Sequence, residues 1–249
     1  MALMKTWNPA LNVNSFRIDQ AVSGEAMTLN GTVNKTGILL ICVVAAAAWS
    51  WSRFFSDPVS NTVFPFVAIG GIGGFIFAMV TIFKKEWSPI TAPLYSLLEG
   101  LALGGISAVF ELRYPGIAMR AVELTFGTLF VLLLAYHSGL IPVTEKFKLG
   151  VVAATGGMAV FYLAQFVLGF FGVRFAAING SGVLGIGFSV VVVIVASLNL
   201  VLDFDFIESG VSSGAPKYME WYGAFALIVT LVWLYLEILR LLSKLNSRN

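Results

Sequence analysis

The stretch FAAINGSGVLGIGFSVVVVIVASLNLVLDFDFIESG, Phe175–Gly210, carries no charge over residues 175–202 and then ends in three acids. An uncharged run of this length is long enough for a helix to cross a bilayer, which takes about 20 residues. Asp203, Asp205 and Glu208 follow the run directly. Because carboxylates are costly near lipid, these acids either mark the membrane surface or have a function at that depth.

The composition of the whole chain places it among polytopic membrane proteins. Of its 249 residues, 58% are apolar and 11% are charged, which is too few charges for the surface of a soluble domain of this size. The 25 glycines suit the close approach of membrane helices. The net charge of +2 comes without a basic tract, so we expect the lipid bilayer and no nucleic acid as a partner. The single cysteine, Cys42, excludes a disulfide framework.

Seven apolar runs have the length of a membrane span, and they are continuous rather than alternating, which favours helices over strands. We predict an all-α integral membrane protein with spans at 37–55, 62–83, 90–110, 119–137, 150–171, 183–204 and 220–242. Residues 1–36 are rich in polar residues and turn formers. They are predicted to form a polar N-terminal arm, with a short helix near 16–21, ahead of a seven-helix transmembrane domain at 37–249.

Ionisable residues within the predicted spans are the candidate site residues, since an acid at membrane depth should face the bundle interior or water. The spans hold the acids Glu99, Glu123, Asp203, Asp205 and Glu237, and the last is followed by Arg240. Two of these acids have a cation three residues away on the same helix. Glu123 with Arg120, and Glu237 with Arg240, are therefore predicted to form interfacial ion pairs.

The remaining acids have no such local partner. Glu99 is either a protonated group that hydrogen-bonds across helices, which is a packing role, or part of a polar pathway. Asp203 and Asp205 are two residues apart, so on a helix their side chains point roughly 200° away from each other. At most one of them faces a cavity, and we expect this to be Asp203, with Asp205 and Glu208 at the interface.

The sequence lacks the residue patterns that several classes of enzyme need. His137 and Ser138 are neighbours in the chain, whereas a serine protease brings its histidine against a nucleophile from elsewhere in the fold. The glycines of GGIGG, Gly70–Gly74, precede no βαβ unit, so their spacing indicates helix packing rather than nucleotide binding. One histidine among scattered acids makes a zinc site unfavourable. We expect neither an enzyme nor a cofactor.

The seven short-looped helices resemble the Bax inhibitor family, the transmembrane Bax-inhibitor-motif proteins, and in particular a divergent bacterial branch of it. The resemblance runs from about residue 37 to the end. Its most specific parts, besides the acidic end of the sixth span, are LLEGLALGGISAVFE at 97–111, RAVELTFGTLFVLLLAY at 120–136 and YGAFALIVTLVWLYLEILRLL at 222–242. The resemblance implies a fold in which the last helix is central among the other six.

The resemblance also implies a pH-sensitive calcium leak. In that mechanism two carboxylates, on the sixth and seventh helices, share a proton and close the pore. Two carboxylates in contact at low dielectric cannot both ionise cheaply, and once ionised they attract a hard cation that prefers oxygen ligands. By position, the sixth-helix acid falls on Asp203, with Ile207 four residues on. The third-helix acid falls on Glu99, followed by Gly100.

The seventh helix departs from the family pattern. Thr230 stands where the second aspartate belongs, and Glu237 is seven residues later, on nearly the same helix face but about 10 Å along the axis. Either Asp203 pairs with Glu237 through a shifted geometry, or the dyad is absent. In the second case Thr230 would donate a hydrogen bond to Asp203, and the pH response would be weakened or moved.

The expected function is therefore a pH-sensitive, calcium-permeable leak in a bacterial inner membrane. Asp203 would be the gate acid that holds calcium transiently, Thr230 or Glu237 its partner, and Glu99 a pore-side group; calcium and protons are the expected ligands. The alternative is a non-transporting regulator that binds other membrane proteins, such as proteases or cell-death factors, through the arm at 1–36. A proton-coupled carrier is disfavoured, because the halves show no inverted repeat.

Overall fold

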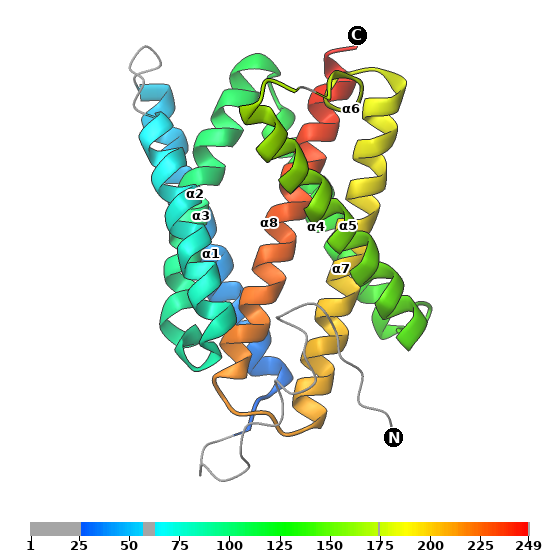
Figure 1. Cartoon of the computed structure of the whole chain (residues 1–249). Helices are drawn as coiled ribbons and strands as arrows, with labels where there is room; N and C mark the ends of the chain where they lie inside the picture. Colours follow the sequence, from blue (N-terminus) through cyan, green and yellow to red (C-terminus); the bar gives the residue numbers. More distant parts are fainter. Residues whose placement is uncertain (1–25, 57–62, 174, 249) are drawn as a thin grey trace. The chain divides into compact units, whose positions relative to one another are not determined.

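The computed structural model describes residues 26–56, 63–173 and 175–248, and within them it is all-helical (Figure 1). The helices are α1 (Leu29–Ser56), α2 (Val63–Phe83), the 3-10 turn η2 (Lys85–Trp87), α3 (Ser88–Arg113), α4 (Ile117–His137), α5 (Glu145–Phe170), the short α6 (Ala176–Asn179), α7 (Val183–Ser212) and α8 (Met219–Asn246). Seven of these are long and apolar enough to cross a membrane, namely all except η2 and α6. The all-α prediction with seven spans is confirmed, whereas the central position of the last helix stays a prediction.

The chain divides into two compact units. The first consists of Met1–Arg113 with Asp205–Val229, and the second of Tyr114–Phe204 with Thr230–Asn249. Both boundaries on the C-terminal side fall inside helices, so α7 and α8 each contribute residues to both units. The predicted helix near 16–21, and most of the polar arm at 1–36, lie outside the described residues.

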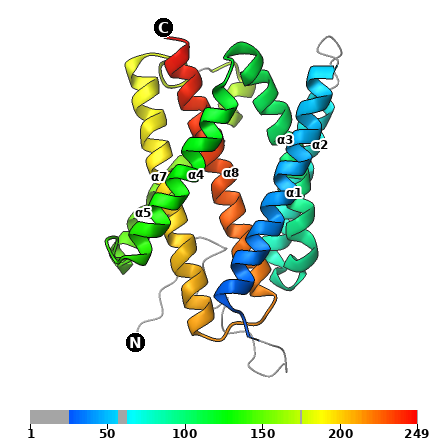
Figure 2. The ribbon, with the colours of Figure 1, turned by 180° about the vertical axis from the view of Figure 1, so that it is seen from behind.

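In the first unit, α3 lies beside α1 (Figure 2). Glycines of α3 form the contact between the two helices. A Cβ atom at Gly100 would overlap the carbonyl oxygen of Val43, and one at Gly104 would overlap that of Ala47. Lipid gives no hydrophobic driving force between two membrane helices, so their association depends on this close backbone approach. The two glycines, four residues apart, therefore fix where α1 crosses α3.

α3 also packs against α2, and in this contact the glycines belong to α2. A Cβ atom at Gly70 would lie 2.5 Å from the carbonyl oxygen of Leu98 and 2.7 Å from the amide nitrogen of Ala102. One turn later, a Cβ atom at Gly74 would lie 2.7 Å from the Glu99 carboxylate. The prediction that GGIGG serves helix packing is confirmed.

Two helices, α1 and α7, extend furthest beyond their predicted ends, and polar contacts explain the extension of α1. α1 begins at Leu29 rather than at 37, because its polar first turns are capped: the Gly31 amide donates to the Thr28 hydroxyl at 3.0 Å. α7 continues to Ser212 rather than stopping at 204, so the whole acidic stretch is helical. Asp203 and Asp205 therefore do lie on different faces of one continuous helix, as the sequence predicts.

The second unit is held by side chains from α5, α7 and α8. Aromatic rings of α5 and α7 gather in one cluster, in which Phe161 and Phe188 have centroids 5.1 Å apart and Tyr162 contacts Phe188 at 6.4 Å. The amide of Asn199 on α7 donates to the Thr155 hydroxyl of α5 at 2.8 Å. These contacts fix α5 against the face of α7 that also carries Asp203, four residues after Asn199.

Neighbouring glycines of α2 give a direct test of this packing. Gly70→Ala should lower the free energy of unfolding by roughly 1–3 kcal/mol, because its Cβ would meet the α3 backbone, which cannot rotate away. Gly71→Ala is the matched control, since its Cβ would meet nothing within 4 Å. Unfolding by SDS titration in mixed micelles, followed by tryptophan fluorescence, measures both. Equal stability of the two variants would contradict the assigned α2–α3 contact.

Candidate functional site

The first candidate site is the Asp203 carboxyl on α7. Its side chain is only 7% exposed, although the residue follows a long uncharged run. Thr230 of α8, which is equally buried, donates a side-chain hydrogen bond to it. The Oδ2 atom of Asp203 is buried and has no hydrogen-bond partner within the described part of the chain. One carboxylate oxygen is thus held by a neutral hydroxyl, and the other remains available as an acceptor.

Glu237, the other acid considered as a partner for Asp203, has different contacts. Its Oε1 atom accepts hydrogen bonds from Arg240 at 2.7 Å and from the Tyr162 hydroxyl at 3.1 Å. The guanidinium of Arg240 also lies over the Tyr162 ring, 5.5 Å from its centroid. The predicted ion pair of Glu237 with Arg240 is confirmed. The structure therefore brings Asp203 together with Thr230, and Glu237 together with Arg240 and Tyr162.

Glu237 nevertheless shares two properties with Asp203. It is only 3% exposed, and its Oε2 atom is buried without a hydrogen-bond partner among the described residues. A buried carboxylate whose second oxygen is unsatisfied is costly in a low-dielectric interior. Each of the two acids keeps one carboxylate oxygen that can still accept a hydrogen bond or contact a cation.

Glu99 lies in the first unit, on the face of α3 that meets α2. Its side chain is half-buried, and its carboxylate rests against the α2 backbone at Gly74. A larger residue at position 74 would displace the Glu99 carboxylate. This position is compatible with both predicted roles of Glu99, as a packing group between helices and as part of a polar pathway.

The secondary candidates differ in exposure. Asp205 is half-buried and Glu208 is exposed on α7. Glu123 and Arg120 are both exposed on α4, and among the described residues no ion pair joins them, so the predicted pairing is not formed there. Exposure explains the difference from Glu237 and Arg240, because an exposed pair gains little from contact.

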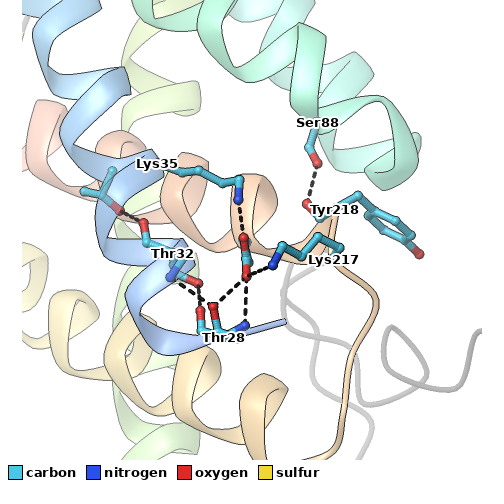
Figure 3. A network of polar contacts seen from close by, with 9 residues as sticks. Thr28, Thr32, Lys35, Ser88, Lys217 and Tyr218 are labelled. Atoms are coloured by element: carbon cyan, nitrogen blue, oxygen red, sulfur yellow. Dashed lines mark hydrogen bonds and ion pairs between the residues drawn. The ribbon is translucent and has the colours of Figure 1, made fainter. Parts of the chain in front are cut away.

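One polar network was missed by the sequence analysis: the cluster around Glu220 at the start of α8. The Glu220 side chain is fully buried, and its Oε1 atom accepts from the amide and the hydroxyl of Thr28, each at 2.9 Å. Lys35 of α1 forms an ion pair with the same carboxylate, and Lys217 lies 3.5 Å from it. In Figure 3, Thr28, Lys35 and Lys217 converge on one point. A Cβ atom at Gly31 would overlap this carboxylate.

The cluster joins the start of α1 to the start of α8. Its carboxylate lies at the N-terminal end of α1, where free backbone amides and the helix dipole favour an anion. The only local signal in the sequence was the three-residue spacing of Lys217 and Glu220; the other contacts are about 190 residues apart and have no local pattern.

The connection before α8 is held at two further points. The Met27 amide donates to the Ala215 carbonyl at 2.7 Å, and the Ser88 hydroxyl donates to the Tyr218 carbonyl at 3.0 Å (Figure 3). Burial, together with the nearby carboxylate of Glu86, raises the pKa of the Tyr218 hydroxyl above its ordinary value. The phenol therefore stays neutral, and the α7–α8 connection is fixed by neutral contacts as well as by Glu220.

A second missed feature is the ammonium group of Lys244 near the end of α8. Its Nζ atom donates to the carbonyl oxygens of Ile178 at 2.8 Å and Gly185 at 3.0 Å, and to the Ser189 hydroxyl at 2.9 Å. We call these three acceptors the oxygen cage. The signal that points to Lys244 is its position seven residues after Glu237 and fourteen after Thr230, on one helix face.

Among the described residues, no group of three or more histidine, cysteine, aspartate or glutamate side chains is placed to hold a metal ion. Of the candidate acids, Asp203 has a neutral partner in Thr230, and Glu237 has a cationic partner in Arg240.

The comparison with known proteins gives one match. The family model described as Bax inhibitor 1 like matches residues 8–247, which is nearly the whole chain. No curated protein and no solved structure matches.

The Glu220 cluster predicts a large stability effect. Glu220→Ala should lower the free energy of unfolding by about 3 kcal/mol, because it leaves Lys35 and the Thr28 amide without their buried partner. The matched control is Glu145→Ala, which removes an exposed glutamate 3.6 Å from Lys148 and should cost under about 1 kcal/mol. SDS titration measures both. A Glu220 variant as stable as the Glu145 variant would refute the structural role of the cluster.

Proposed function

The chain belongs to the Bax inhibitor 1 like family, and from this premise we propose that it is a calcium-permeable leak channel whose opening depends on pH. Asp203 is the gate acid, and Thr230 is its partner in the closed state. Protonated Asp203 is neutral and attracts no cation. Ionised Asp203 attracts calcium, a hard cation that prefers oxygen ligands. The membrane is the bacterial inner membrane.

The observation that carries this proposal is the buried, half-satisfied carboxyl of Asp203. Its Oδ2 atom has no hydrogen-bond partner among the described residues, and the carboxyl accepts a hydrogen bond from the neutral Thr230 hydroxyl. A carboxyl without a cation beside it changes charge with pH more readily than one in an ion pair. The charged groups that α8 presents further along the same face are Glu237, with Arg240, and Lys244.

The replacement of the family's second aspartate by Thr230 also has a defined consequence. A hydroxyl can donate a hydrogen bond to Asp203 but cannot share its proton with it as a second carboxyl does. The gate therefore responds to one ionisation rather than to a coupled pair. Glu237, in the same unit as Asp203, supplies a further oxygen ligand along the route of calcium.

The test is calcium flux into proteoliposomes as a function of pH. Flux through the wild-type protein should rise with pH, because ionisation of Asp203 opens the gate. Asp203→Asn should lower flux by roughly tenfold at the high-pH end and remove its pH dependence, since the side chain stays neutral. Thr230→Val removes the hydroxyl that contacts Asp203 in the closed state, so flux at the low-pH end should rise.

Glu145→Gln is the control for these variants, because it neutralises an exposed acid of α5 in the same unit. Its flux should follow the wild-type curve. A flux that is indifferent to pH, or equal in Asp203→Asn and Glu145→Gln, would rule out Asp203 as the gate.

The alternative, a regulator that acts through the polar arm, can be separated from the leak by deletion. The deletion has to stop at residue 25, because Met27 and Thr28 hold the α7–α8 connection and Glu220. A protein lacking residues 1–25 should keep its full calcium flux if the leak is intrinsic. Loss of flux on this deletion, with the protein still folded, would favour a function that depends on the arm.

A further inference from the structure

α8 carries a buried polar stripe in the second unit. Thr230, Glu237 and Lys244 follow one another at intervals of seven residues, which places them on nearly one face of the helix. They are 7%, 3% and 7% exposed. Ionisable groups buried within a membrane helix are rare and mark pathways or partners inside the protein.

The contacts at the two ends of this stripe fix the register of α7 against α8. Asp203 meets Thr230 at one end, and Ser189 meets Lys244 at the other. Fourteen residues separate the contacts on both helices, so the two helices run antiparallel and in step. Midway between the contacts, this register pairs position 196 of α7 with position 237 of α8.

Ala196 is fully buried and its side chain is a single methyl group. At the corresponding position of α8, the Oε2 atom of Glu237 is buried without a hydrogen-bond partner among the described residues. The stripe thus presents, in order, Thr230 with the Asp203 carboxyl bound to it, the acid Glu237 and the ammonium group of Lys244. Each step is about 10 Å, which is two turns of helix.

The ammonium group is held in the manner of a bound cation. An ammonium has three N–H donors, and the oxygen cage offers three acceptors between 2.8 and 3.0 Å away. Two of the acceptors are backbone carbonyl oxygens, the ligands that replace the hydration shell of monovalent cations in membrane proteins. A Cβ atom at Gly185 would overlap the Gly180 carbonyl oxygen, so a glycine is needed for the loop to close around the cage.

We propose that the oxygen cage is an ammonium-binding site and that Lys244 fills it as a blocking cation attached to the protein itself. This inference rests on the proposed leak function. Lys244 occupies the end of the polar stripe that a permeating cation would otherwise reach. Arg240 does not serve this purpose, because it is paired with Glu237 and its side chain is 45% exposed.

The test replaces Lys244 in two ways. Lys244→Ala leaves the cage empty with room for a small amine, whereas Lys244→Met fills the space with an uncharged chain. Calcium flux should rise roughly tenfold in both, because a positive charge about 10 Å from Glu237 is removed. Lys146→Ala, which removes an exposed lysine of α5, is the matched control and should leave flux unchanged.

Propylammonium matches the part of the lysine side chain, alkyl chain and ammonium group, that is missing in Lys244→Ala. It should restore the low flux of Lys244→Ala and leave Lys244→Met unaffected, and tetramethylammonium, which has no N–H donor, should affect neither. Unchanged flux in Lys244→Ala, or raised flux that propylammonium does not lower, would overturn the blocking role.

A thermal unfolding measurement separates this inference from the leak function. Propylammonium should raise the melting temperature of Lys244→Ala in detergent and not that of Lys244→Met, whether or not the protein conducts calcium. Failure of this stabilisation would overturn the ammonium site itself. Absence of calcium flux from the wild-type protein and Lys244→Ala alike would overturn the leak and the block, while the unfolding result still decides whether the cage binds ammonium.

Discussion

A polar side chain inside a membrane helix has to find its partner within the protein, because lipid offers no hydrogen bonds. The C-terminal helix α8 depends on this constraint along much of its length. Glu220 is satisfied by Thr28 and Lys35 in the first unit. Thr230 and Glu237 find partners in the second unit, on α7 and α5.

These buried acids differ in how many of their carboxylate oxygens have a hydrogen-bond or ion-pair partner. The difference distinguishes the structural acid from the acids proposed to have a function. Glu220 has a donor for each of its carboxylate oxygens, which suits a fixed joint between α1 and α8. Asp203 and Glu237 each keep one buried oxygen without a partner in the described part of the chain. A cation stabilises a group with an unsatisfied acceptor, and this is why we propose that ions act on these two acids.

The sequence was informative wherever a pattern is local. Apolar runs gave the seven spans, and the two-residue spacing of Asp203 and Asp205 separated their faces. The three-residue spacing of Glu237 and Arg240 predicted an ion pair that forms. The same spacing failed for Arg120 and Glu123, because spacing does not tell whether a pair is buried, and an exposed pair gains too little to form. The Glu220 cluster and the oxygen cage could not be predicted from the sequence, because the residues that form each of them come from distant parts of the chain.

The central claim is that Asp203 is the group whose charge governs the leak, and infrared difference spectroscopy tests it most directly. On acidification, the protein in liposomes should gain the carbonyl band of a protonated carboxyl, with a midpoint that coincides with the loss of calcium flux. Asp203→Asn should abolish that band. A band that persists unchanged in Asp203→Asn, or one whose midpoint is unrelated to that of the flux, would contradict the account.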